Sequence, residues 1–262
     1  MIIDGQYVSS WIRGLLFPAL CLRLTAATVT LPAVADTSIF EGNPDFNLGG
    51  TTLVSGTNQQ YSRSRAMFRF DLSSIPAGAV VSNAEVLIYV SRRPDPDQHT
   101  GPVNSNFSLY RMFVGWGQGT GGNATGSTAA AGDATWNERH YGSTSWNSPG
   151  ALIGVDYAGT ASATTAVSGV GSYVWSSSLA LTDDVQTWLG APLTNFGFIL
   201  VSNEEAAIGS GRRFGSTEQP GGLVPPPQLV VTYSNVPELP ASGMILLGIA
   251  GLVLLRIRRA NG

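Results

Sequence analysis

Short apolar runs, in which every second residue is hydrophobic, dominate the middle of this 262-residue chain. In the run 66–72, Phe68 and Phe70 share one face, and the run 84–90 places Val86, Ile88 and Val90 on one face in the same way. Further runs of this kind cover residues 107–113, 196–201 and 229–233. Alternation with a period of two predicts β-strands that each bury one side.

A single segment has helical spacing instead. Val185, Trp188 and Leu189 fall at i, i+3 and i+4, with Thr182 or Asp183 as the expected cap and Gly190 as the expected end. Stretches rich in Gly, Ser, Thr and Ala at about 117–134 and 158–172 are expected to be exposed loops. Many strands, one short helix and no βαβ alternation predict an all-β fold, a single jelly-roll β-sandwich over residues 36–235.

The N-terminal 35 residues have the pattern of an export signal. Arg13 precedes an apolar stretch over 14–22, and Ala33-Val34-Ala35 has the small-x-small form that signal peptidases cleave. We therefore expect residues 1–35 to be a signal peptide, with the mature chain beginning at Asp36. The only cysteine of the chain, Cys21, lies in this segment, so the mature protein would have no thiol and no disulfide.

The C-terminal residues 236–262 combine a proline motif, an apolar run and a basic end. Val236, Pro237 and Glu238 precede the apolar run 244–255, and an arginine cluster follows at 256–259. The run predicts a short transmembrane helix whose arginines stay in the cytoplasm. A plain tail anchor would have the same pattern.

The order of these three elements resembles the PEP-CTERM and VPLPA-CTERM sorting tails of Gram-negative bacteria. Val236-Pro237-Glu238 is similar to the first form, and residues 239–243 are similar to the end of the second. The resemblance implies that an exosortase-type sorting enzyme processes the tail. It also implies that the protein resides at the cell envelope or surface, or in the extracellular matrix, and is anchored in the membrane at least transiently.

Charge argues against one class of partner. Charged residues make up 12% of the chain, and lysine is absent. Without the two flanks, 9 Arg stand against 15 Asp and Glu, a balance of −6. An acidic body without a basic stripe predicts no nucleic-acid binding, because phosphate contacts need clustered cations.

A second resemblance covers nearly all of residues 36–233. The run 65–79, followed by 81–86, resembles the signature of DNRLRE-domain proteins. Other blocks follow in the order of that family: 36–39, 43–49, 134–137, 146–150, 181–188, 214–218 and 227–233. The resemblance implies a jelly-roll sandwich of the kind found in extracellular bacterial and archaeal proteins. These often accompany polysaccharide-degrading domains, and some are classed as carbohydrate-binding modules.

Aromatic and arginine side chains are the candidates for binding sugar. Trp136, Tyr141 and Trp146 lie in a polar, glycine-flanked segment, where exposed rings would stack on pyranose faces. Alternatively, the two tryptophans fold back onto the sandwich. Paired hydrogen bonds to acidic sugars could come from four arginines, or these could serve only surface solubility: Arg63, Arg65, Arg212 and Arg213.

Calcium is the expected cofactor, in a structural role. It takes six to eight oxygen ligands and stabilises extracellular β-folds that lack disulfides. The expected ligands are Asp36, Asn47, Asp184 and Glu218. The alternative is that these residues only make hydrogen bonds in turns and at strand ends.

No catalytic constellation stands out in the sequence. His99 and His140 are expected in loops, and no G-x-S-x-G motif is present. We therefore predict a non-catalytic surface or matrix protein whose sandwich binds or scaffolds extracellular polysaccharide. One alternative is a polysaccharide lyase or glycoside hydrolase that uses loop carboxylates, or His140 with Tyr141. Another is a purely structural surface protein without a specific ligand.

Overall fold

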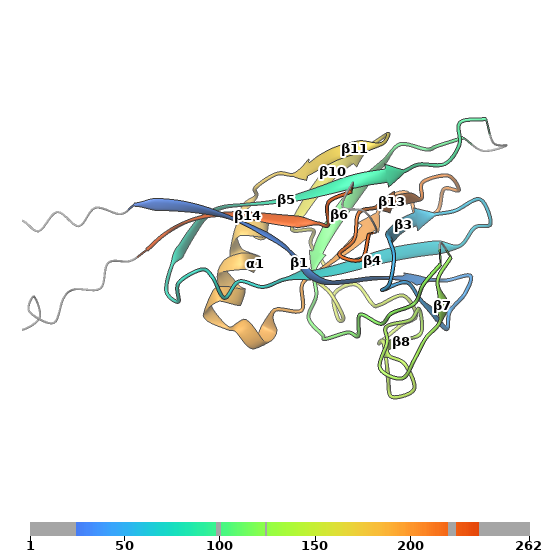
Figure 1. Cartoon of the computed structure of the whole chain (residues 1–262), viewed down its shortest axis with the longest axis horizontal. Helices are drawn as coiled ribbons and strands as arrows, with labels where there is room; N and C mark the ends of the chain where they lie inside the picture. Colours follow the sequence, from blue (N-terminus) through green and yellow to red (C-terminus); the bar gives the residue numbers. More distant parts are fainter. Residues whose placement is uncertain (1–24, 98–100, 124, 220–223, 236–262) are drawn as a thin grey trace, which may run out of the picture. The chain divides into compact units, whose positions relative to one another are not determined.

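The computed structural model describes residues 25–97, 101–123, 125–219 and 224–235, which belong to one compact unit, Thr25–Val236 (Figure 1). The unit is mostly β-structure with one α-helix, so the all-β prediction is confirmed. Its strands are β1 Ala26–Phe40, β2 Phe46–Asn47, β3 Leu53–Thr57, β4 Arg63–Phe70, β5 Val80–Arg92, β6 Ser105–Arg111, β7 Ser127–Thr128, β8 Glu138–His140, β9 Thr144–Ser145, β10 Ala163–Val167, β11 Gly171–Trp175, β12 Phe198–Ser202, β13 Arg212–Phe214 and β14 Gln228–Ser234. The helix α1 spans Leu179–Gly190, and a 3-10 turn, η1, follows at Pro192–Thr194.

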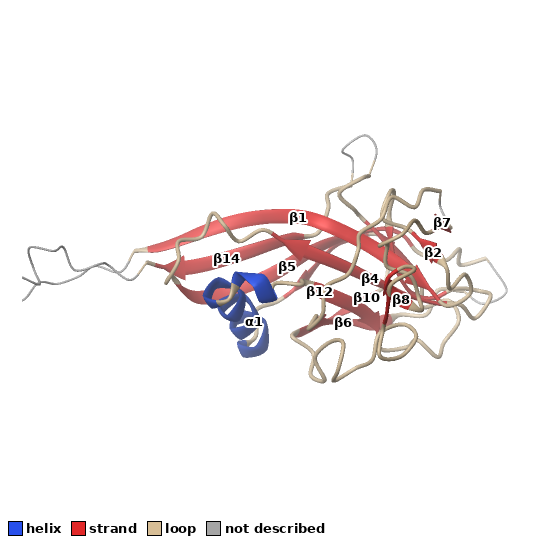
Figure 2. Cartoon of the chain, turned by 90° about the horizontal axis from the view of Figure 1, so that it is seen from below, coloured by secondary structure: helices blue, strands red, loops and turns tan. Residues whose placement is uncertain are grey.

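Two antiparallel layers form the sandwich, as Figure 2 shows from below. In the first, β14 lies between β1 and β5, β11 pairs with β5, and β13 pairs with both β5 and β3. In the second, the order is β1, β4, β12, β6 and β10. Strand β1 belongs to both layers because a register shift between Ala33 and Ala35 bends it from β14 to β4.

The main core lies between the layers and is rich in aromatic rings. Phe68 and Phe70, predicted to share a face, are both buried there, and Phe68 also lies 6.3 Å from Phe198 between ring centroids. The helix α1 inserts Trp188 against Phe198 at 4.8 Å and packs against β5. Val86, Ile88 and Val90 of β5 point into this core as predicted.

A second apolar cluster covers the outer face of the second layer. Met67 and Ile199 point outward from β4 and β12, on the side opposite the main core. Trp136, Trp146 and Tyr157, from the long connections between β6 and β10, pack onto them. This layer is therefore apolar on both faces, and the segment in which Trp136 and Trp146 were expected to be exposed contains part of the protein's interior.

Two local predictions were wrong. The helix begins at Leu179, not at Thr182 or Asp183, because Ser178 is its cap: its hydroxyl accepts the Leu181 N–H at 3.0 Å. The stretch 158–172 contains β10 and the first residues of β11, although its Gly, Ser and Thr residues resemble a loop. Pairing with β6 and β5 supplies backbone hydrogen bonds that composition does not reveal.

Residues that precede the predicted domain boundary belong to the sheet in this structure. Strand β1 begins at Ala26, ten residues before the predicted boundary at Asp36. Ala33 and Ala35, the expected cleavage motif, are buried inside this strand rather than in an accessible linker. Cleavage after Ala35 would remove the half of β1 that pairs with β14.

Candidate functional site

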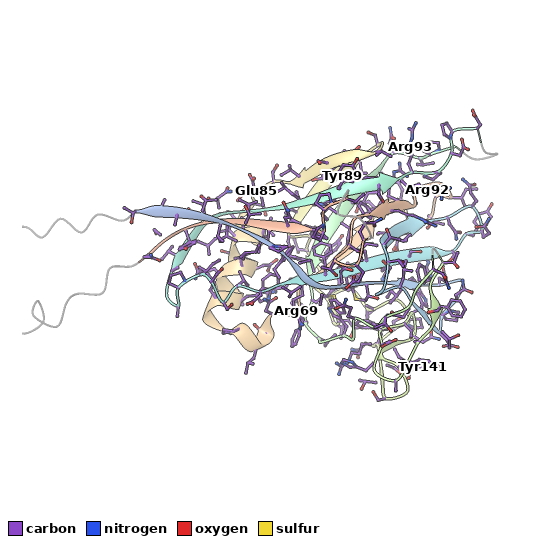
Figure 3. All side chains as sticks on the ribbon, in the orientation of Figure 1. Arg69, Glu85, Tyr89, Arg92, Arg93 and Tyr141 are labelled. Atoms are coloured by element: carbon purple, nitrogen blue, oxygen red, sulfur yellow. The ribbon has the colours of Figure 1, made fainter. Side chains whose placement is uncertain are left out.

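The two tryptophans predicted to stack on sugar are not available for it. Trp136 is 4% exposed and Trp146 is 5% exposed, so they fold back onto the sandwich as the alternative proposed. The Trp146 indole N–H donates to the Thr135 carbonyl at 2.8 Å. Tyr141 follows β8 and is half-buried, and Figure 3 shows it at the outer end of the β8–β9 hairpin. The three rings do not form one platform.

Arg63 and Arg65 form ion pairs within the domain instead of being free to bind an acidic sugar. Arg63 forms an ion pair with Glu41 at 2.6 Å, and its hydrogen bonds lower the pKa of that carboxyl. Arg65 pairs with Glu205 at 2.8 Å. Both guanidinium groups also lie over the ring of Trp136, at 5.4 Å and 5.5 Å from its centroid, where cation–π attraction adds to the packing.

Arg212 is buried, with 1% of its surface exposed. Its partners among the described residues are all backbone carbonyls: the guanidinium donates to those of Ser168, Val103, Gly209, Ser210 and Gly211, at 2.8–3.2 Å. Burial lowers its pKa. These contacts join β13 to the chain before β6 and to the β10–β11 turn, so Arg212 positions the neighbouring Arg213 rather than serving as an exposed ligand contact.

An open groove of about 390 Å³ lies where the end of β5 meets β13 and the β3–β4 turn. Its walls are formed by Arg92, Arg93 and Asp95 on one side, and by amide residues of the turn, among them Asn58 and Gln60. Arg92 and Arg93 are both exposed, and Figure 3 shows them at the end of β5. The groove is therefore polar and reachable from solvent.

Positive charge collects in this groove although the domain as a whole is acidic. Arg92 pairs in register with Arg213 of the neighbouring strand. Burial, followed by the charge of Arg92, lowers the pKa of Arg213. Within the described ranges, no ion pair involves Arg92 or Arg93. Two exposed guanidinium groups are thus available to an anionic ligand.

Beside the groove, one tyrosine is held in an unusual conformation. Tyr61 has a φ of 61° and is 71% exposed. The turn is built around Asn58, whose side-chain oxygen accepts the N–H groups of Gln60 and Ser62 at 2.9 and 3.0 Å. Positive φ in a non-glycine residue is costly and is often found at functional sites. The sequence analysis did not predict Tyr61 as a site residue. The signal that could have identified it is a single aromatic residue directly after the amide residues 58–60.

The four predicted calcium ligands separate in the structure. Asp36 and Glu218 come together, and burial, then the charge of Glu218, raises the pKa of Asp36 to about 7. Asp184 lies elsewhere, where it accepts the Ser162 hydroxyl at 2.5 Å and pairs with Arg111 at 3.3 Å. The Asn47 side-chain oxygen is already occupied by two backbone N–H groups. No three His, Cys, Asp or Glu side chains gather around a common point within the described part of the chain.

The remaining predictions concern the two histidines, the signal segment and the sorting motif. His140 lies on β8 with its Nδ1 atom 3.2 Å from the Gly132 carbonyl. His99, most of the predicted signal segment and the sorting residues Val236, Pro237 and Glu238 lie outside the described residues. In the part of the chain that is described, no helix has both the length and the apolar character needed to cross a membrane.

Comparisons with protein families and with curated proteins found no match.

Proposed function

We propose that this chain is an exported, non-catalytic surface protein whose β-sandwich binds an acidic polysaccharide in the groove between β5, β13 and the β3–β4 turn. The observation that supports this most directly is the pair of exposed arginines, Arg92 and Arg93, in the wall of an open groove beside the exposed ring of Tyr61. This site takes the place of the buried Trp136 and Trp146.

The chemistry of the groove suits uronate or sulfate-bearing sugars. A guanidinium group donates two parallel hydrogen bonds to a carboxylate, a geometry that ammonium groups cannot supply. The exposed amide of Gln60 can bond sugar hydroxyls in either direction, since amides both donate and accept, whereas the Asn58 oxygen is already occupied within the turn. The Tyr61 ring offers an apolar face for a pyranose, as aromatic rings do in many sugar sites.

The position of the groove is consistent with display at a surface. Ala26 and Val80 both pair with Ser234, so the described ends of the chain lie beside the start of β5. From Val80 to Arg92, β5 extends roughly 40 Å at the usual rise per residue. Figure 1 shows the groove strands at the end of the sandwich opposite these chain ends. The groove and the described chain ends therefore lie at opposite ends of β5.

The broader assignment belongs to the same proposal. Two antiparallel layers that share β1 support a jelly-roll sandwich of the DNRLRE type. The C-terminal tail supports processing by an exosortase-type enzyme, and residence at the envelope, surface or matrix of a Gram-negative bacterium. Membrane attachment through the tail would be at least transient.

The test is binding of the full-length chain, in mild detergent, to acidic and neutral polysaccharides on a glycan array. We expect retention by acidic glycans that weakens as salt rises, because exposed charges are screened. Arg92→Gln with Arg93→Gln should weaken binding about tenfold or more, and Tyr61→Ala should also weaken it. Arg69→Gln, an exposed arginine of β4, is the matched control (Figure 3).

Three results would contradict the proposal. Equal retention of wild type and the double variant would place the site elsewhere. No retention by any glycan would favour a purely structural surface protein. Release of unsaturated or reducing sugar ends during incubation would show a lyase or hydrolase instead.

A further inference from the structure

Two carboxyl groups that are distant in sequence lie together inside the domain. Asp36 is in β1, and Glu218 is in the turn that follows β13. Asp36 is fully buried. The Thr217 N–H donates to Asp36 Oδ2 at 2.7 Å, whereas Asp36 Oδ1 is buried and accepts no hydrogen bond from any described residue. Half of this carboxylate is therefore unsatisfied.

Glu218 also has one carboxylate oxygen that accepts a hydrogen bond and one that does not. Its Oε1 accepts a hydrogen bond from the Gln118 amide at 2.6 Å, while its Oε2 is buried without a donor in the described structure. Gln219, the next residue in the turn, has a buried Oε1 in the same condition. Among the described residues, five buried side-chain polar atoms have no partner, and three of them are these oxygens. Asp36 and Glu218 interact directly, and Gln219 follows Glu218 in the chain, so a bound cation would satisfy buried oxygens that otherwise lack a donor.

Among the residues that the structure describes, no arginine forms an ion pair with Asp36 or Glu218. The ion pairs found among the described residues join Arg63 to Glu41, Arg65 to Glu205 and Arg111 to Asp184. Burying two carboxylates side by side without a positive partner is costly. The raised pKa of Asp36, whose causes are burial and then Glu218, reflects that cost.

We propose that Asp36 Oδ1, Glu218 Oε2 and Gln219 Oε1 bind a calcium ion. All three donors are hard oxygens, two of them charged, and this set suits calcium rather than zinc, which favours nitrogen and sulfur. Calcium also accepts irregular geometry and completes its six to eight ligands with backbone carbonyls and water. Magnesium demands a near-ideal octahedron and is therefore the weaker candidate.

Asn47 has a positioning role in this site. Its oxygen accepts the Gly49 and Gly121 N–H groups, and its amide nitrogen donates to the Gln118 carbonyl at 2.9 Å. This fixes the backbone of Gln118, whose side chain bonds Glu218. Gly119 has a φ of 74° and a Cβ there would collide with Asn47, so the loop must contain a glycine at this point. Asn47 therefore acts through Gln118 and is not a ligand.

The ion would join three segments: β1, the turn after β13, and the glycine-rich loop 117–126 through Gln118. In a chain with a single cysteine, which cannot form an internal disulfide, the ion would act as a cross-link between these segments. A calcium ion that binds the folded chain and not the unfolded chain raises the free energy of unfolding, and the increase grows with the logarithm of the calcium concentration.

The experiment uses the full-length chain in mild detergent, stripped with EDTA, and measures calcium binding by calorimetry together with thermal unfolding. We expect one site, and a rise in Tm of roughly 5–10 °C at calcium 100-fold above Kd. Magnesium at the same concentration should give a smaller rise. Glu218→Gln preserves size and can still accept the Gln118 hydrogen bond, and it should weaken calcium binding about tenfold or more.

Glu85→Gln, at a half-buried position of β5, is the matched control and should bind calcium like the wild type. Asp36→Asn provides a second variant, since its side-chain oxygen can still accept the Thr217 N–H. The proposal is overturned if the stripped wild type shows neither binding heat nor a Tm shift with calcium. In that case a shared proton joins the two carboxyls, and Glu218→Gln should raise the Tm without any metal.

Discussion

Trp146 and Tyr61 both stand in polar segments between strands, yet 5% of the first and 71% of the second is exposed. The difference comes from the surface beneath them. The segment with Trp146 lies on the apolar outer face of the second layer, formed by residues such as Met67 and Ile199. Tyr61 lies in the turn that joins β3 to β4, and its ring stays largely exposed there.

We expect Trp146→Ala to destabilise the domain by about 3–5 kcal/mol, the usual cost of deleting a large buried ring. The substitution leaves a cavity in the second cluster and removes the donor to the Thr135 carbonyl. Urea unfolding monitored by circular dichroism measures the change. Tyr61→Ala, an exposed substitution, should shift the free energy of unfolding by no more than about 0.5 kcal/mol. Equal effects of the two substitutions would contradict the assigned roles.

The buried side chain of Arg212 connects separate segments of the domain through hydrogen bonds to their backbone carbonyls. We expect Arg212→Lys to cost about 3–5 kcal/mol, because an ammonium group has three donors and lacks the planar fork that reaches carbonyls on separate segments. The free energy of unfolding from urea titration is the measurement, with Arg93→Lys in the exposed groove wall as the control. A stable Arg212→Lys protein would show that the carbonyl contacts are dispensable.

At the scale of elements, β1 connects the two layers. Residues 26–32 pair with β14, whereas Ala33 and, after the shift at Val34, residues 35–40 pair with β4. Sequence reasoning recognised the strands with clear alternation, such as β4 and β5. It missed the first half of β1, because Ala26–Ala35 resembles the end of a signal peptide as much as an edge strand. The strand is recognisable only from its pairing with β14, which is about 200 residues away in the sequence and leaves no local signal.

A truncation separates the two interpretations of this segment. We expect the fragment 25–236 to unfold cooperatively, and the fragment 36–236 to be destabilised by several kcal/mol or to aggregate. Removing residues 26–35 strips β14 of its edge partner and exposes Leu229 and Val231 beside unpaired backbone groups. Thermal unfolding and size-exclusion chromatography of the two fragments provide the comparison. Equal stability would show that the mature domain begins at Asp36, as the Ala33-Val34-Ala35 motif suggested.

The candidate site was less accessible to sequence reasoning than the fold. Alternation identifies which face of a strand is buried, but the groove is assembled from the ends of β5, β13 and the β3–β4 turn, which are far apart in the chain. For the proposed calcium site, the residue types suggested Asp36, Asn47, Asp184 and Glu218. Burial beside each other is what distinguishes Asp36 and Glu218 from Asp184, which Arg111 and Ser162 satisfy. Three-dimensional contacts carry this information, and residue type alone does not.

At the scale of the whole molecule, the described chain ends and the groove lie at opposite ends of β5. If the flanks export the chain and hold it at the envelope, the groove end should face the medium. Asp97, exposed just beyond Arg93, allows a test, because Cys21 is the only native cysteine and lies in the predicted signal segment. In a Cys21→Ser background, we expect Asp97→Cys to react with a membrane-impermeant maleimide on intact cells. Labelling that requires lysis would show that the domain stays inside, and the surface assignment would then be wrong.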